Sequence, residues 1–349
     1  MTIRPRRAIH TTASVCFAIA CLIASSAHAQ DVSSFARTTS PLSQAQQNTL
    51  EGFVSSGVQG LKDETSQSVV EARRRLIEPL TRAGTSAVFR EAFGNLFVKQ
   101  IKALLESDES LPVFNYANIC QVLAFTRTGE TNEFLASTLQ PRAGDDSDAT
   151  QSQGRALSAA SMLVVSIQTT DPESIRPRQF NSIMRSVLMG AEQTSSWAVL
   201  QREFEALESI GSNPRVKEDI RKSAIENQMK LMQVTLDKIA EGRDMDLTRA
   251  LSSMILKLRS QYIRLEGSIR RTFKSEVEPV LNEVLKTGAQ SWDQLQSSKE
   301  VKELYGNSIE QAGVLIRLIQ GGSTSGSGAN LAEAWQSGDK SAYQSGIGN

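Results

Sequence analysis

Apolar residues recur at steps of three and four along most of the chain, which is the spacing of one face of an α-helix. The clearest run covers 86–106 and contains Phe89, Phe93, Leu96, Phe97, Ile101, Leu104 and Leu105. No stretch alternates apolar and polar residues with the enrichment in β-branched types that is typical of a strand, so we expect no sheet. The pattern predicts an all-α fold.

Three helix-like runs near the middle of the chain are the most apolar ones. They align with one another when they are superposed on Tyr116, Ala156 and Ala198. The offsets between these residues are 156 − 116 = 40 and 198 − 156 = 42. With a unit of two helices, this period resembles HEAT or armadillo-type repeats over roughly residues 85–211, and the segment 205–211 is the most similar to such a repeat.

The resemblance implies stacked helical hairpins over 41–211 and an extended groove on which protein partners bind. The chain departs from the repeat pattern at the loop 140–154, which is long and acidic, and it lacks the usual Asp-x-x-Val-Arg turn. The alternative is a set of unrelated amphipathic helices of similar length.

Beyond these runs the expected helices are longer and more highly charged. One apolar stripe covers 225–239, and a second covers 251–277, where Pro279 is expected to end the helix. Stripes of this kind must be buried against partner helices, so we expect a long-helix hairpin or bundle over 212–320. A basic segment within it is expected to be a solvated helix face rather than a patch for an anionic polymer or a membrane; it contains Lys257, Arg259, Arg264, Arg270, Arg271 and Lys274.

The first 29 residues have the pattern of a secretory signal peptide. Arginines precede an apolar segment at 13–24, and Ala27-His28-Ala29 is an A-x-A cleavage site. The apolar segment is short for a membrane span, which requires roughly 20 residues. We therefore expect cleavage between Ala29 and Gln30, export to the periplasm or the extracellular space, and a mature chain without a transmembrane segment. Residues 30–40 are polar and are predicted to be disordered.

The composition of the exported chain excludes several chemistries. Cleavage changes the balance of charged residues to 35 basic and 38 acidic, so the net charge is 35 − 38 = −3, which gives no general attraction for nucleic acid. Both histidines and two of the three cysteines lie in the signal segment, which leaves Cys120 as the single cysteine. Histidine-dependent nucleophile pairs and His or multi-Cys metal sites are thereby excluded. We expect a buried thiol at Cys120, no cofactor and no metal site, because the acidic loop lacks the ligand spacing of an EF-hand.

The chain ends in a Gly/Ser-rich stretch followed by a short segment with large side chains. Its composition predicts a flexible tail over 321–349. Large apolar side chains are nevertheless costly to leave in water. We therefore expect a docking segment at 330–345, on the protein's own helices or on a partner, with simple disorder as the alternative; its anchors are Leu331, Trp335 and Tyr343. Because two or three anchors hold a tethered segment only weakly, deletion of the tail is expected to leave the melting temperature nearly unchanged.

Two classes of function fit these features. The first is an exported, non-enzymatic helical scaffold that binds protein partners in the cell envelope. The second is a glycan hydrolase or lyase of the envelope that works through carboxylates, since Asp/Glu pairs require no histidine. Such an enzyme is expected to hold two carboxyls in a cleft floored by aromatic rings, yet the aromatic fraction is only 5%, and the tryptophans are far apart in the sequence, at Trp197, Trp292 and Trp335. We favour the first class and assign no catalytic residue.

Overall fold

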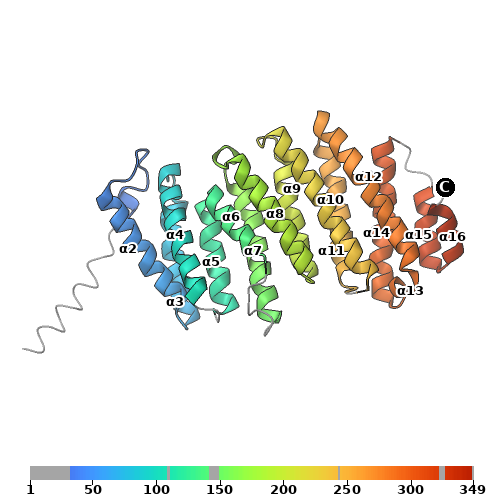
Figure 1. The fold of residues 1–349 in the computed structure, drawn as a ribbon, viewed down its shortest axis with the longest axis horizontal. Coiled ribbons are helices and arrows are strands. Elements are labelled where there is room, and N and C mark those ends of the chain that lie inside the picture. Colours follow the sequence, from blue (N-terminus) through green and yellow to red (C-terminus); the bar gives the residue numbers. More distant parts are fainter. Residues whose placement is uncertain (1–31, 108–110, 141–148, 243, 322–326, 348–349) are drawn as a thin grey trace, which may run out of the picture.

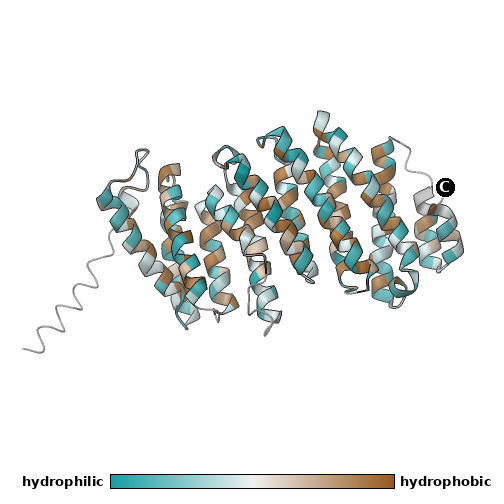
Figure 2. Ribbon diagram, in the orientation of Figure 1, coloured by the Kyte–Doolittle hydropathy of each residue, from teal (hydrophilic) through white to brown (hydrophobic). Residues whose placement is uncertain are grey.

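The computed structural model describes residues 32–107, 111–140, 149–242, 244–321 and 327–347. All regular secondary structure in these ranges is helical, with no strand, so the all-α fold class is confirmed. The helices lie side by side along one long axis (Figure 1). Apolar and polar positions are interspersed along each helix (Figure 2), because each helix buries only part of its surface.

The helices form two rows that run the length of the molecule. Row A consists of α3 (Ser66–Thr81), α5 (Val113–Thr126), α7 (Ala149–Thr169), α9 (Trp197–Ser212), α11 (Leu247–Arg264), α14 (Lys299–Gln320) and α15 (Ser327–Ser337). Row B consists of α2 (Gln44–Leu61), α4 (Ala87–Ser107), α6 (Gly129–Ser137), α8 (Pro177–Gln193), α10 (Glu218–Ala240), α12 (Gly267–Gln290) and α16 (Lys340–Ile347). Each helix packs on its neighbours in its own row and on a helix of the other row. The short elements are η1 (Val32–Ser34), η3 (Pro172–Ser174) and α13 (Trp292–Leu295).

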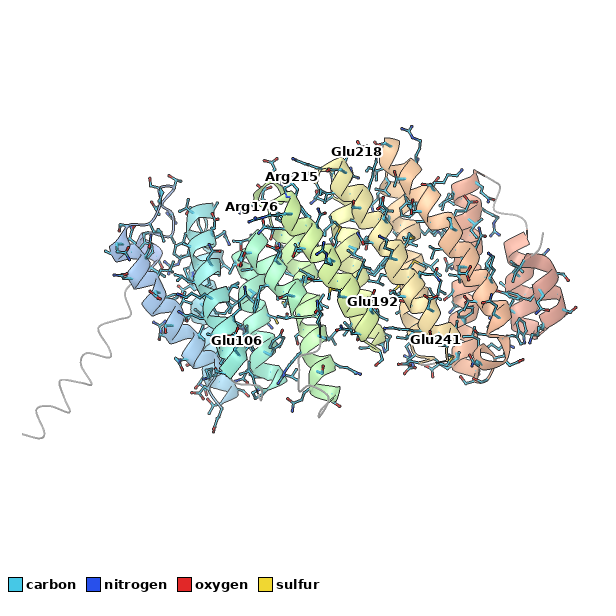
Figure 3. All side chains as sticks on the ribbon, viewed as in Figure 1. Glu106, Arg176, Glu192, Arg215, Glu218 and Glu241 are labelled. Atoms are coloured by element: carbon cyan, nitrogen blue, oxygen red, sulfur yellow. The ribbon has the colours of Figure 1, made fainter. Side chains whose placement is uncertain are left out.

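From α2 to α12, successive helices of the chain alternate between the two rows, so their connections alternate between two edges of the stack. In the orientation of Figure 3, Arg176, Arg215 and Glu218 lie at the upper edge. Glu106, Glu192 and Glu241 lie at the lower edge in the same view. The connections α3–α4, α5–α6, α7–α8 and α9–α10 therefore all lie at the upper edge, although about 45 residues of chain separate each from the next.

The three apolar runs of the sequence are the consecutive row A helices α5, α7 and α9. Buried positions of α5 and α7 match at the expected offset of 40, as at Ile119 and Ala159. Between α7 and α9 the buried positions match at 203 − 159 = 44 rather than at 42, since Ala159 and Glu203 are both fully buried. The sequence alignment is therefore two residues out of register at α9, because it matched residue types without knowing which face is covered.

The long helices expected over 212–320 are present, and they continue both rows instead of forming a separate bundle. Helix α9 packs on α10 and α11, and α8 packs on α10, so the packing has no break at 211–212. Between α10 and α11, Gln228 and Gln261 are fully buried and exchange two side-chain hydrogen bonds of 3.1 Å. This reciprocal pair satisfies the buried amides of both residues within the core.

The second long apolar stripe is divided at a place that the sequence analysis did not predict. Helix α11 ends at Arg264 and α12 begins at Gly267, which has φ +57°, a conformation that suits glycine. Pro279 lies inside α12 and does not end it. The spacing of apolar residues continues from α11 into α12 because both helices bury their apolar stripes in the same core. The turn between them is therefore not visible in the apolar pattern of the sequence.

The N-terminal segment corrects a second expectation. Residues 30–40 were expected to be disordered, but Val32, Phe35 and Ala36 are buried. The ring of Phe35 lies 6.0 Å from that of Phe89, in an edge-on arrangement, and the Ala36 carbonyl accepts a hydrogen bond of 2.9 Å from the Ser86 N–H. This segment therefore covers the beginning of α4, because a few apolar side chains within a polar stretch are enough to fix it.

The described part of the chain holds no helix that is both long enough and apolar enough to cross a membrane.

Candidate functional site

The two edges of the stack carry opposite charge. Among the described connections, six basic residues lie at the upper edge, against three acidic ones; the basic residues are Arg37, Arg82, Arg127, Arg176, Arg215 and Lys217. The described connections of the lower edge contain one basic residue, Lys62, and seven acidic ones, which are Asp63, Glu64, Glu241, Asp244, Asp246, Asp293 and Asp339. The connections of the upper edge are therefore the more basic ones, although Arg82 and Arg215 are ion-paired there.

A cavity of about 550 Å³ opens at the upper edge, where the connections α3–α4, α5–α6 and α7–α8 meet. This volume is within the usual range for small-molecule sites, about 300–1,000 Å³. The first turns of α4, α6 and α8 contribute to its wall, so the partial positive charge of three helix N-termini lies nearby. Four arginines line the cavity, and we call it the arginine cavity: they are Arg90, Arg127, Arg176 and Arg178.

Arg90 is held by two backbone carbonyls. Its guanidinium donates from Nη1 to the Phe125 carbonyl at 3.0 Å and from Nη2 to the Leu80 carbonyl at 2.5 Å. Burial lowers the pKa of Arg90, and the positive charge of Arg127 lowers it further. Two like charges therefore lie close together in a partly desolvated place, where a bound anion stabilises both.

Arg127 ends α5 in an unusual conformation. Its φ is 57°, and it is the one non-glycine residue with positive φ in the part of the chain that the structure describes. This conformation costs an L-residue roughly 1–2 kcal/mol. The Nε of Arg127 is buried without a hydrogen-bond acceptor among the described residues. Backbone strain and an unsatisfied donor in one residue are features that gather at ligand sites.

Threonine hydroxyls fix the turn that carries Arg127. Thr126 donates to the Leu123 carbonyl at 2.6 Å, and Thr131 donates to the Thr128 carbonyl at 3.0 Å. The Thr128 hydroxyl accepts the Thr131 N–H at 3.3 Å and so caps the start of α6. The position of the turn thus follows from buried hydrogen bonds and not from the strained residue itself.

The opposite wall comes from the connection α7–α8 and the first turn of α8. The Gln179 side chain accepts the Arg176 N–H at 3.0 Å and packs against Gly129, where a Cβ would lie 2.4 Å from its Oε1. A side chain at position 129 would therefore have to displace the Gln179 amide. Asp171 also lines the cavity, but it is ion-paired with Arg215 at 2.6 Å and does not neutralise the four arginines.

Glu91 and Glu130 are the other acidic residues of the wall. Neither forms an ion pair with a cavity arginine among the described residues. With Asp171 paired, the wall carries a net charge of 4 − 2 = +2. The cavity is therefore suited to an oxyanion held by charge-assisted hydrogen bonds. No Trp or Tyr lines it, so it lacks the aromatic floor that we expect of a glycan enzyme.

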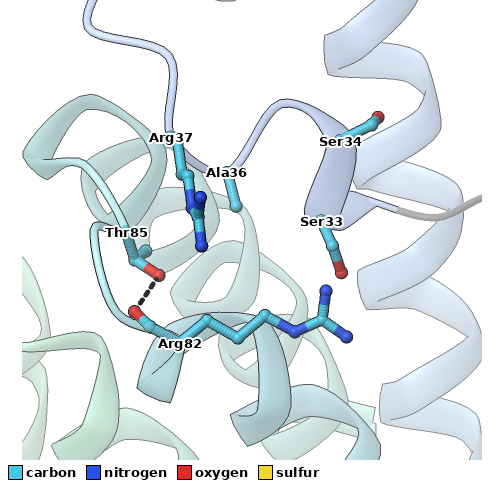
Figure 4. Close-up of a pocket in the computed structure, with 6 residues that line it drawn as sticks. All are labelled: Ser33, Ser34, Ala36, Arg37, Arg82 and Thr85. Atoms are coloured by element: carbon cyan, nitrogen blue, oxygen red, sulfur yellow. Dashed lines mark hydrogen bonds between the residues drawn. The ribbon is translucent and has the colours of Figure 1, made fainter.

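A smaller pocket of about 310 Å³ adjoins the arginine cavity and shares Thr85 with it. Figure 4 shows Arg37 pointing into this pocket between Thr85 and Arg82. Thr85 donates to the Arg82 carbonyl at 2.9 Å, and the Arg82 guanidinium pairs with Glu78 at 2.6 Å. The positive lining of the upper edge therefore continues toward the N-terminal segment.

Leu331, Trp335 and Tyr343, the residues that the sequence analysis singled out in the tail, are buried with exposed fractions of 5%, 0% and 0%. Leu331 and Trp335 lie on α15, and Tyr343 lies on α16. These helices pack on α12 and α14 of the same chain and form the last layer of the stack. The described residues 327–347 are thus helical instead of flexible, whereas 322–326 lie outside the described residues.

Two further predictions concern metal sites and the thiol of Cys120. No group of three His, Cys, Asp or Glu side chains in the described ranges is placed to hold a metal ion. The aspartates at 145–148 lie outside the described residues. Cys120 is buried, as predicted, with an exposed fraction of 1%.

A buried carboxyl on α9 was missed by the sequence analysis. Glu203 is fully buried, and neither of its carboxyl oxygens has a hydrogen-bond partner in the described part of the chain. Burial raises the pKa of Glu203 well above its usual range, although the charge of Lys238 acts in the opposite direction. Lys238 itself donates to the carbonyls of Ala191 and Thr194, at 2.6 and 2.5 Å. The helical periodicity could have indicated this burial, because position 203 falls on the buried stripe of α9.

In comparisons with known proteins, no family model matches the chain, and no curated protein or solved structure matches it either. The packed helix pairs are compatible with a helical repeat, so the geometry of the stack and its surface is the basis for assigning a function.

Proposed function

We propose that this protein is an exported, non-enzymatic scaffold, similar to HEAT or armadillo-type repeat proteins, whose row A surface binds a protein partner in the cell envelope. The proposal rests on the position of the large apolar side chains that are exposed to solvent. Seven of the eight among the described residues belong to row A: Val70, Phe114, Val165, Trp197, Leu256, Ile263 and Leu318. The eighth is Met189 on α8 of row B. An apolar surface that continues along one row is typical of an interaction site, and we infer that these seven side chains contribute to one.

Polar side chains tie neighbouring helices of row A together at this surface. The pairs are Arg73–Gln121 at 2.7 Å, Gln168–Ser209 at 3.2 Å, Lys257–Glu205 at 3.1 Å, Arg264–Glu208 at 2.8 Å and Arg259–Gln311 at 3.4 Å. The basic residues of α11 are thus engaged by neighbouring helices and do not form a separate anion-binding patch. Ties of this kind hold the surface in one arrangement, which lowers the ordering cost of binding a partner.

The carboxylate enzyme is the alternative class. Its distinguishing feature is a pair of facing carboxyls above Trp or Tyr rings in one cleft. The arginine cavity brings Glu91 and Glu130 into one wall, but four arginines and no aromatic ring accompany them. Of the tryptophans, Trp292 and Trp335 are buried in the last layer of the stack. These observations favour the scaffold.

A double variant of row A tests the binding surface. Val165→Asp with Leu256→Asp places two charges on α7 and α11, at side chains that are 39% and 46% exposed. We expect at least a tenfold loss of partner binding, because two desolvated charges oppose docking. Cross-linking in envelope extract with quantitative mass spectrometry identifies the partner captured by the unmodified protein and measures its loss.

The matched control is Met189→Asp, which adds a charge at a side chain of row B that is 39% exposed. It is expected to retain the partner. Equal capture by the double variant and the unmodified protein contradicts the row A proposal, provided that far-ultraviolet circular dichroism shows the same helical content for all three.

The export part of the proposal has its own test. The mature chain is expected to begin at Gln30, because the A-x-A site ends at Ala29. Intact mass spectrometry of the protein recovered from a secreting host measures the loss of residues 1–29. A mass that retains this segment, or that carries an acyl group on Cys21, contradicts the processing prediction.

A further inference from the structure

We propose that the arginine cavity is a binding site for the oxyanion group of a small ligand, a phosphate monoester or a carboxylate. This site lies at the upper edge, so it is separate from the exposed apolar side chains of row A and does not depend on the proposed scaffold function. Its volume of about 550 Å³ accommodates a small molecule but not a folded domain.

The two inner arginines of the cavity, Arg90 and Arg127, carry positive charges that lie close together. Arg90 is held by two carbonyls and faces the like charge of Arg127 in a partly desolvated place. Arg127 also has a buried Nε without an acceptor among the described residues. An oxyanion in the cavity supplies the negative charge that both arginines lack, and planar guanidinium groups match carboxylate and phosphate oxygens well.

The rest of the cavity wall holds both basic and acidic side chains. Arg176 and Arg178 bring two further positive charges from the start of α8, and Asp171 is occupied by Arg215. Two acidic residues, Glu91 and Glu130, limit the net charge to +2. This mixed wall favours a compact ligand with one or two negative charges over a long polyanion, which the two carboxylates would repel.

Binding is tested by isothermal titration calorimetry at low ionic strength, because screening weakens exposed charge interactions. The probes are inorganic phosphate, glycerol 3-phosphate and succinate. Saturable binding of the two phosphate probes with little binding of succinate identifies a phosphate site. The reverse order identifies a carboxylate site. Failure of all three probes to bind saturably overturns the proposal.

A matched pair of variants distinguishes binding in the cavity from a general attraction of anions to positive charge. Arg178→Gln removes a charge from the cavity wall, whereas Arg185→Gln removes the same charge from an exposed position of the same helix, outside the wall. We expect about tenfold weaker binding for Arg178→Gln, a loss of about 1.4 kcal/mol, and no change for Arg185→Gln. Equal weakening by both variants overturns the proposal.

A variant that is expected to bind more tightly controls for loss of binding through misfolding. Glu91→Gln removes a negative charge from an exposed position of the wall, so it is expected to tighten binding severalfold. Arg127→Gln is expected to weaken binding at least tenfold, since it removes a positive charge from the inner wall of the cavity. Unchanged binding in both variants overturns the assignment of this cavity.

Discussion

Replacement of Trp335 by alanine is expected to lower the free energy of unfolding by about 3–5 kcal/mol. Trp335 is fully buried, and its ring centroid lies 4.8 Å from that of Trp292 and 5.4 Å from that of Tyr305. Its Nε1 donates to the Lys302 carbonyl at 2.9 Å. The replacement therefore leaves a large cavity in the last layer of the stack and removes this hydrogen bond.

Deletion of 321–349 is expected to act in the same direction and with a larger effect. It uncovers the apolar faces of α12 and α14, and terminal layers of a helical stack are needed for stability. The sequence predicts an almost unchanged melting temperature for this deletion, and the burial of Trp335 and Tyr343 contradicts that expectation. Two or three anchors hold a tethered segment weakly only while they stay partly exposed, whereas Trp335 and Tyr343 are fully enclosed.

Chemical denaturation followed by circular dichroism measures both changes. The control is Trp197→Ala, because Trp197 is 37% exposed on row A and its loss creates no internal cavity. We expect the control to change the free energy of unfolding by about 1 kcal/mol or less. If Trp335→Ala and Trp197→Ala have equal effects, the last layer does not contribute the packing described.

The second large effect concerns the pH dependence of stability. Glu203 has a raised pKa because it is buried, so it stays protonated in the folded chain at pH values where the unfolded chain ionises. Its stability contribution is fully present below the unfolded pKa, near 4.3. As the pH rises from that value toward the folded pKa, the free energy of unfolding falls by up to about 1.4 kcal/mol per pH unit.

Glu203→Gln is therefore expected to raise the free energy of unfolding at neutral and alkaline pH and to remove this fall. Glutamine has the same shape and cannot ionise. Denaturation curves measured between about pH 5 and pH 8 test the prediction. A variant that keeps the pH slope of the unmodified protein shows that Glu203 is not the group responsible.

Glu205, two residues further along α9, provides a control of opposite sign. Burial acts to raise the pKa of Glu205, but hydrogen bonds from Arg202 and Lys257 outweigh it and lower the pKa. The stability that Glu205 contributes is present above its unfolded pKa and is lost as the pH falls through the folded pKa. Glu205→Gln is thus expected to reduce stability at neutral pH and to weaken the sensitivity to acid, measured by the same curves.

Local properties of the fold follow from the sequence alone. The helix predicted over 86–106 is α4 at 87–107, since its apolar spacing and its ends are encoded within the segment itself. The burial of Cys120 also agrees with the prediction made from its apolar neighbours. The all-α class required no knowledge of distant contacts, because a period of three and four residues is visible in one helix at a time.

The candidate site was beyond the sequence analysis, although a faint signal existed. An arginine directly follows two row A helices, at Arg82 and Arg127, and Arg176 lies in the next connection of the same edge, directly before α8; the spacings are 127 − 82 = 45 and 176 − 127 = 49. Arg82 and Arg127 by themselves are favourable charges near a helix C-terminus, and Arg176 is the residue that precedes the first turn of α8. Only the alternation of helices between two rows places these three connections on one edge.

The remaining features depended on tertiary packing. The last layer exists because Gly306 and Gly288 leave room for large rings: a Cβ at Gly306 would lie 2.9 Å from Cδ1 of Trp335, and one at Gly288 would lie 2.6 Å from Oη of Tyr343. In the sequence these are two ordinary helix glycines. The sequence by itself determined the helical periodicity and the reactive groups available, because each can be read from residues that are neighbours in the chain. The signal segment is predicted from neighbouring residues in the same way. The tertiary structure decided the single continuous stack, the burial of Glu203 and the arginine cavity, because each joins residues that lie far apart in the chain.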